Sequence, residues 1–277
     1  MSMNYTRREW LATVGTVSLA SAVRPLAITV ATKPLQGAFI ILSTPYTIEG
    51  NLHYEDLSTQ VDFLDRCGVH GLVWPQNSSE QRYLSKAERL RGMDVIADAA
   101  RGKQPAVVFG VQADSTGEML EYAHHAESLN PDGMIAIPPT SARSLKDFQE
   151  YYEALCQVTS RPVFIQTSGG APDVEPTVEF IVNMASEFPN LGYVKEEREP
   201  VHKRMRDLAE HRPQRIKRIF GAAFGRAWLY EMRLGTDGIM TGGAMYADIY
   251  AQLWDCLLYT SDAADDTPCV DLGGRRI

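Results

Sequence analysis

Short apolar runs alternate with amphipathic segments through the middle of the chain. The amphipathic segments carry apolar residues at helical spacing, as Leu57, Val61 and Leu64 do between residues 54 and 67. Continuous apolar runs are typical of strands buried on both faces, which form parallel sheets covered by helices. The predicted strands cover residues 37–46, 71–75, 106–111, 133–137, 162–166, 191–195, 216–222 and 238–241. The predicted helices cover residues 54–67, 85–101, 144–158, 176–187, 201–210 and 226–234, and two more begin at Ser115 and near Tyr246.

This order predicts eight consecutive strand–helix units in about 220 residues, the size of a typical closed (β/α)8 TIM barrel. An open, doubly wound sheet is the alternative, and it usually carries a glycine-rich phosphate loop after its first strand. Here the first strand runs into Ser43-Thr44-Pro45-Tyr46, and the sequence G-x-G-x-x-G does not occur. We therefore expect an α/β fold, with a TIM barrel over residues 37–255.

One of the apolar strands ends in a charged side chain. The strand that begins at Leu191 ends in Lys195, whereas Lys217 lies at the beginning of its strand. An amine in the apolar mouth of a barrel is harder to protonate than one in water, and its free lone pair can attack a carbonyl carbon. The alternative is a lysine that extends from the strand end into water. The strand alone leaves both interpretations open.

The surroundings of Lys195 favour the reactive lysine. In a TIM barrel, the residues that carry chemistry follow the C-terminal ends of the strands. The period-2 alternation points Tyr193 and Lys195 to the same side, and does the same for Phe164 and Gln166. The strand ends carry mainly hydroxyl and amide groups, and the substrate-binding candidates among them are Thr44, Asn77, Ser78, Thr140, Gln166 and the backbone at Gly242.

Composition and charge exclude several classes of partner. The chain has 277 residues, of which 44% are hydrophobic and 22% charged, as in soluble globular proteins. Its net charge of −8 and the lack of a basic block argue against nucleic acid. The 4 cysteines show no paired spacing, and no His, Cys or Asp cluster has the spacing of metal ligands. We expect no metal and no other cofactor.

The first 36 residues have the features of an export signal and linker. Thr6-Arg7-Arg8-Glu9-Trp10-Leu11 resembles the twin-arginine motif, and Ala20-Ser21-Ala22 fits a small-residue cleavage site. The apolar run between them is too short for a stable membrane span. The alternative is a chance arginine pair before an amphipathic helix. We expect a protein that is periplasmic or otherwise exported by the twin-arginine route.

The last 22 residues, 256–277, resemble the translation of a sequencing adapter. Their Asp-, Gly- and Thr-rich end has no hydrophobic period, which is typical of disordered segments. We therefore expect residues 256–277 to be a non-native, disordered tail.

Several segments resemble the dihydrodipicolinate synthase / N-acetylneuraminate lyase family. They are Thr44-Pro45-Tyr46, Glu49-Gly50-Asn51, Phe63-Leu64, residues 68–73, Glu80, Leu84-Ser85 with Glu88-Arg89, and Val194-Lys195-Glu196. These segments occur in the family's order over roughly residues 36–255. The resemblance implies a TIM barrel that condenses or cleaves 2-oxo acids, often pyruvate, through a Schiff base, with Lys195 as the reacting lysine. It also implies a homo-oligomer in the full-length form, partly through C-terminal helices that are missing here.

The chain departs from the family pattern at three strand ends. Gln76-Asn77-Ser78-Ser79-Glu80 stands where the family has Gly-Thr-Thr-Gly-Glu, although Asn77 and Ser78 still offer hydrogen-bond donors for a carboxylate. Pro138-Pro139-Thr140 stands where the family has a tyrosine. Gln166 stands where a second tyrosine transfers protons, and an amide cannot titrate.

Loss of a proton-transfer group typically costs about 10²–10⁴-fold in rate. The candidate substitutes are Glu196, Glu197 and Tyr46. The alternative for the two glutamates, which we favour at this point, is a solvated loop or a pairing with Arg198.

Two functions remain open from the sequence. The first is a lyase or aldolase, or a dehydratase, that acts on a 2-oxo acid or sugar-derived acid through a Schiff base on Lys195. The second is a degenerate barrel that binds a small acid or sugar without turnover, which the missing tyrosines suggest.

Overall fold

The structure, a computed structural model, describes residues 33–266, with side chains through Cys256. Within these residues, eight parallel strands close into a barrel in which each strand pairs with its neighbours in chain order. The strands are β1 (Gly37–Ile41), β2 (Gly71–Trp74), β3 (Ala106–Gly110), β4 (Gly133–Ala136), β5 (Val163–Gln166), β6 (Tyr193–Lys195), β7 (Arg218–Gly221) and β8 (Gly238–Thr241). The predicted TIM barrel is confirmed.

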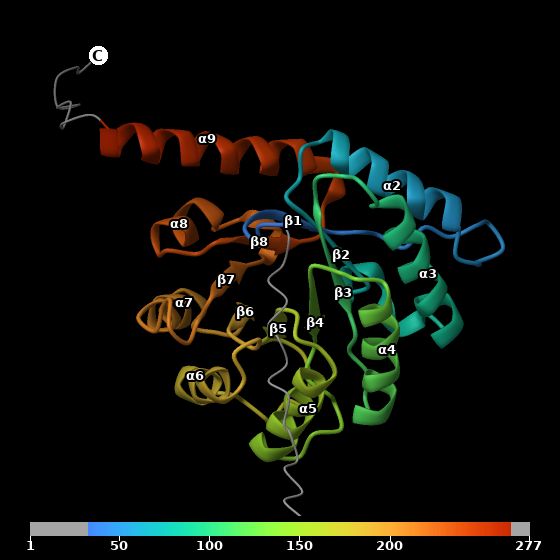
Figure 1. Ribbon diagram of the computed structural model, residues 1–277, viewed down its shortest axis with the longest axis horizontal. Helices are drawn as coiled ribbons and strands as arrows, with labels where there is room; N and C mark the ends of the chain where they lie inside the picture. Colours follow the sequence, from blue (N-terminus) through green and yellow to red (C-terminus); the bar gives the residue numbers. More distant parts are fainter. Residues whose placement is uncertain (1–32, 267–277) are drawn as a thin grey trace, which may run out of the picture.

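Helices follow the strands and cover the barrel from outside (Figure 1). They are α2 (Tyr54–Arg66), α3 (Lys86–Ala99), α4 (Thr116–Ser128), α5 (Leu145–Val158), α6 (Val178–Glu187), α7 (Val201–Ala209), α8 (Trp228–Arg233) and α9 (Ala247–Asp266). None of the described helices combines the length and apolarity that crossing a bilayer requires.

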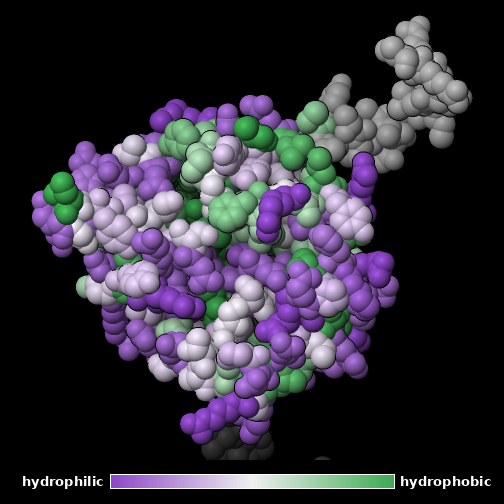
Figure 2. Space-filling model, turned by 180° about the vertical axis from the view of Figure 1, so that it is seen from behind, coloured by the Kyte–Doolittle hydropathy of each residue, from purple (hydrophilic) through white to green (hydrophobic). Residues whose placement is uncertain are grey.

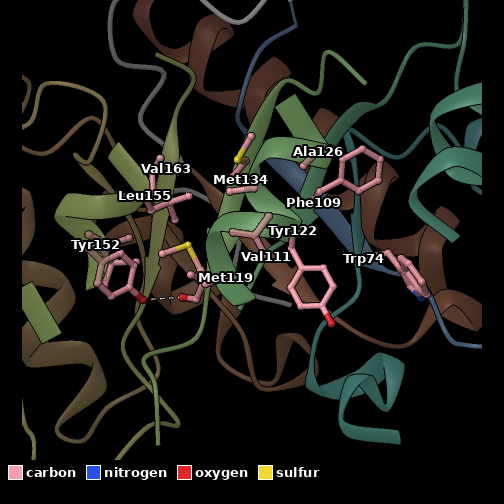
Figure 3. Packing of buried hydrophobic residues seen from close by; sticks show 14 of the residues in the cluster. Trp74, Phe109, Val111, Met119, Tyr122, Ala126, Met134, Tyr152, Leu155 and Val163 are labelled. Atoms are coloured by element: carbon pink, nitrogen blue, oxygen red, sulfur yellow. Dashed lines mark hydrogen bonds between the residues drawn. The ribbon is translucent and has the colours of Figure 1, made fainter. Parts of the chain in front are cut away.

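Two apolar layers hold the barrel together. The inner layer fills the barrel with side chains such as Phe39, Phe164, Phe220 and Met240, all of them fully buried. The outer layer lies between the strands and the helices, where Figure 3 shows Phe109 of β3 beside Ala126 of α4. Strands buried on both faces explain why the apolar runs of the sequence are continuous.

Three boundaries differ from the sequence prediction. Leu35, which was expected in the linker, is 5% exposed and packs in the inner layer, so the barrel fold begins before residue 37. The first strand ends at Ile41 and does not reach Tyr46, whose one bridge joins Leu52 of the following loop.

The third difference concerns the expected disordered tail, because helix α9 continues past residue 255 to Asp266. The cause is local propensity, since leucine and alanine after Cys256 favour continuation of a helix that has already begun. The predicted twin-arginine signal and residues 267–277 lie outside the described residues.

Exposed apolar side chains gather where α8 and α9 begin. Phe224, Leu229, Tyr230, Met245, Tyr246 and Ile249 are each more than half exposed. The two segments lie together, because the Tyr250 hydroxyl donates to the Phe224 carbonyl oxygen at 3.0 Å. Figure 2 shows hydrophobic groups along the upper edge of the molecule, the edge along which α9 lies in Figure 1.

Candidate active site

Lys195 is the last residue of β6 and lies inside the mouth of the barrel. It pairs in register with Gln166 of β5 and Phe220 of β7. Tyr193, two residues earlier, packs against the inner layer, with its ring centroid 5.3 Å from that of Phe164. Alternation therefore points Lys195 inward as well, and the residue is only 4% exposed. The side chain does not extend into water.

Polar groups from β5 and from the loop after β6 surround the Lys195 amine. Its Nζ donates to Gln166 Oε1 at 3.4 Å and lies 3.2 Å from Glu197 Oε2 in an ion pair. The Ser168 hydroxyl donates to the same carboxylate oxygen at 2.6 Å, and Gln166 Nε2 donates to Ser168 Oγ at 3.1 Å. These contacts form a closed ring of four side chains, in which the Lys195 amine is one member.

Glu196 points the other way. It is fully buried, accepts a hydrogen bond from Thr167 Oγ1 at 2.6 Å and lies 3.1 Å from Arg204 Nε of α7. A buried carboxylate needs such a partner, which gives Glu196 a structural role. The expectation of a solvated loop is therefore wrong for Glu196, and Arg198 contacts this carboxylate only through its backbone N–H, which donates to Glu196 Oε1 at 2.9 Å. The Arg198 side chain pairs with Glu175.

Tyr46 is the third candidate substitute for the missing proton-transfer tyrosine. It is 38% exposed, and partial burial together with the charge of Glu80 raises its pKa above 10.0. A phenol that holds its proton more firmly donates it less readily at neutral pH.

Thr44, Ser78 and Gly242 lie on the β8–β1–β2 side of the mouth. The Thr44 hydroxyl donates to the Ser79 carbonyl oxygen and accepts from Trp74 Nε1 at 3.3 Å, which fixes its position. A Cβ atom on Gly242 would lie 3.1 Å from Ser78 Cβ, so glycine allows the end of β8 to approach the loop after β2.

Asn77 and Thr140 line a cavity of about 420 Å³ beyond β2, β3 and β4. Its wall includes Arg89, which is 4% exposed, donates to the Gln112 carbonyl oxygen at 2.9 Å and stacks 3.8 Å from the centre of the Tyr122 ring. Lys195 is not among the lining residues of this cavity. The structure thus brings Gln166 to the lysine and places Asn77 and Thr140 on a neighbouring cavity.

Three residues that contribute to the site or to the neighbouring cavity were not among the candidates chosen from the sequence. Ser168 lies two residues after the end of β5, and its place among the strand-end hydroxyls was the available signal. Arg204 lies in an amphipathic helix, where nothing in the sequence marks it as the partner of Glu196. Arg89 appears in the family resemblance without an assigned role. Among the described residues, no group of three or more His, Cys, Asp or Glu side chains could hold a metal ion.

Known proteins resemble the chain in sequence and in fold. The sequence model of the Dihydrodipicolinate synthetase family matches residues 34–258. A 4-hydroxy-tetrahydrodipicolinate synthase from Neisseria meningitidis serogroup B is 28% identical over 163 residues, which cover 58% of this chain and 55% of the relative. A probable 2-dehydro-3-deoxy-D-pentonate aldolase from Escherichia coli is 25% identical, over 78% of this chain and 71% of the relative. The match thus spans little more than half the length of the synthase.

Among solved structures, dihydrodipicolinate synthase from Aquifex aeolicus superimposes with a TM-score of 0.75 at 21% sequence identity. The superposition covers 82% of this chain and 77% of the synthase. At this identity the likeness establishes the shared fold alone.

Proposed function

Because the chain belongs to the dihydrodipicolinate synthetase family, we propose that it is a lyase of the aldolase or dehydratase type. Its substrate is a 2-oxo acid or a sugar-derived acid, which it holds as a Schiff base on Lys195. The observation that supports this proposal most strongly is the buried Lys195 amine, which points into the barrel mouth and contacts Gln166 and Glu197.

An imine on Lys195 explains how one side chain performs carbon–carbon chemistry. The amine attacks the carbonyl carbon of the 2-oxo acid, and water leaves as the C=N bond forms. The protonated imine then withdraws electrons from the neighbouring carbon. A carbon–carbon bond to that carbon can break or form, or a β-hydroxyl group can leave.

The substrate-binding residues are proposed from their positions around the mouth. Asn77 and Ser78 are exposed in the loop after β2 and offer donors to the substrate carboxylate. Thr44 and Gly242 border them, and Gln166 lies beside the reacting amine. Thr140 lines the same cavity as Asn77, which supports a role for its hydroxyl in binding the distal part of a longer sugar acid.

Turnover tests this proposal. Purified protein is incubated with a panel of 2-oxo-3-deoxy sugar acids, and two products are followed: pyruvate, which an aldolase releases, and the dehydrated oxo acid, which a dehydratase releases. We expect release of one of these products from at least one member of the panel and none from Lys195→Arg. Lys103→Arg, which changes a lysine paired with Asp62 on the outside of the barrel, is the matched control and should retain full activity. Equal release by the Lys195→Arg variant contradicts the proposal.

The second candidate, a binding protein without turnover, is favoured by one observation. The group beside Lys195 on β5 is the amide of Gln166, which cannot transfer protons as a phenol does. In calorimetry, saturable binding of a 2-oxo acid that persists in Lys195→Ala, together with no turnover by the unmodified protein, would support this candidate.

A further inference from the structure

We propose that Glu197 is a second catalytic residue, which carries protons to and from Lys195 and its substrate. This role rests on the proposed function. The site needs such a group because forming an imine requires several proton transfers. One neighbour of the amine, Gln166, cannot provide them. The other, Glu197, is a carboxylate whose Oε2 lies 3.2 Å from Nζ.

The structure holds this carboxylate against the amine. Ser168 donates to Glu197 Oε2 at 2.6 Å, and Gln166 in turn donates to Ser168 at 3.1 Å, so two side chains of the β5 end fix the carboxylate position. The Glu197 backbone N–H also donates to Thr167 Oγ1 at 2.8 Å. A carboxylate that Ser168 holds, on a residue whose backbone Thr167 fixes, stays within the distance that proton transfer requires.

The neighbouring charges are engaged elsewhere. Arg198 forms an ion pair with Glu175, and Arg204 pairs with Glu196. Lys195 is therefore the cation that pairs with the Glu197 carboxylate. The Glu197 side chain is 23% exposed, compared with 5% for Lys195, which places the carboxylate between the barrel interior and solvent. This position allows it to exchange protons with water between steps.

The protons balance with one carboxylate as the carrier. Glu197 takes a proton from the Lys195 ammonium group, and the free amine forms the C–N bond while the carbonyl electrons move to oxygen. Protonated Glu197 gives its proton to that oxygen and then removes a proton from nitrogen, which leaves a carbinolamine. It finally protonates the hydroxyl group, which departs as water while the nitrogen lone pair forms the C=N bond. The result is an iminium, one water molecule and an ionised Glu197.

The rate of imine formation tests this role separately from the proposed function. Pyruvate is added to the full chain, the imine is reduced with borohydride at timed intervals, and the adduct on Lys195 is measured by peptide mass. We expect Glu197→Gln and Glu197→Ala to slow its formation by about 10²–10⁴-fold. Glu199→Gln, an exposed carboxylate two residues away, is the control and should match the unmodified protein.

Two further readouts distinguish proton transfer from a structural role. Added formate should restore part of the rate to Glu197→Ala, because a small acid can occupy the vacated place. The rate of imine formation by the unmodified protein should fall as the pH is lowered, and this fall should be smaller in Glu197→Gln. If Glu197→Gln and Glu197→Ala both form the adduct within threefold of the rate of the unmodified protein, the role of Glu197 is overturned. The role of Lys195 then still stands. An unmodified protein that forms no adduct with pyruvate or with any member of the panel of 2-oxo acids overturns the proposed function itself.

Discussion

Three consecutive charged residues at the end of β6 have three different environments. Lys195 points into the barrel, Glu196 points outward to Arg204, and Glu197 turns back to the lysine. Alternation along the strand predicted the first of these directions from the sequence alone. It could not predict the pairings, because the partners Ser168 and Arg204 belong to other elements. The two glutamates therefore looked like part of a solvated loop until the fold brought these partners together.

The Glu196–Arg204 pair gives a prediction about stability. The two side chains are 0% and 11% exposed, so Arg204→Leu leaves a buried carboxylate without its cation. We expect a loss of about 3–5 kcal/mol in the free energy of unfolding, measured by urea denaturation. Lys203→Ala on the same helix breaks an exposed pair with Asp207 and should cost less than about 1 kcal/mol. Similar losses in the two variants would contradict a structural role for the buried pair.

Glu231 on α8 gives a prediction about pH. Its side chain is 4% exposed, and burial raises its pKa above the ordinary 4.5, an effect that nearby His202 only partly offsets. The folded state therefore binds the proton more tightly than the unfolded state. The stability that this group contributes is present below about pH 4.5 and is lost as the pH rises through the folded-state pKa.

Glu231→Gln removes the buried charge and should raise the midpoint of thermal unfolding at pH 7.5 relative to the unmodified protein, and less so at pH 4.5. Glu150→Gln, at an exposed position on α5, should show no such difference between the two pH values. A Glu231→Gln effect that is the same at both pH values would count against the assignment.

At the scale of elements, the sequence predicted each strand and each of the α-helices from α2 to α9, because period and length distinguish the two kinds of segment. Boundaries were less predictable. The first strand stops at Ile41 because the next residues leave the barrel wall, and only the neighbouring strand reveals where pairing ends. Leu35 packs in the inner layer, but it was assigned to the linker from the sequence because a single apolar residue shows no hydrophobic periodicity.

Two helical glycines give opposite predictions for the same substitution. A Cβ on Gly92 of α3 would lie 2.2 Å from Trp74 Cη2, and Trp74 is 1% exposed and cannot move aside. Gly92→Ala should therefore cost about 1–3 kcal/mol in the free energy of unfolding. Gly117 of α4 has no atom within 4 Å of such a Cβ, so Gly117→Ala should stabilise by up to about 1 kcal/mol. Urea denaturation measures both, and a stabilising Gly92→Ala would contradict the packing.

At the scale of the whole molecule, the closed barrel was predictable because eight strand–helix units in this length have few other arrangements. The division of the barrel mouth into a lysine site and a separate cavity was not predictable. Asn77 and Thr140 line the cavity beyond β2, β3 and β4, whereas Gln166 lies beside Lys195. Loop conformations set this division, and strand periodicity contains no information about them.

The exposed apolar side chains of α8 and α9 give a prediction about solubility. Leu229 and Ile249 are 55% and 57% exposed among other large apolar groups, and contiguous apolar surface promotes association. We expect the chain to aggregate at high concentration. The double variant Leu229→Glu with Ile249→Lys should reduce this aggregation, as measured by light scattering. Ile48→Lys changes an isolated, fully exposed residue and should have little effect. A monodisperse unmodified chain would contradict this prediction.

The central claim is that the Lys195 amine captures a carbonyl compound inside the barrel mouth. The most direct measurement is reduction with borohydride in the presence of pyruvate, followed by peptide mass analysis of the whole chain. The account predicts one adduct, located on Lys195, that disappears in Lys195→Arg. An adduct spread over surface lysines, or none with any 2-oxo acid tested, would contradict it.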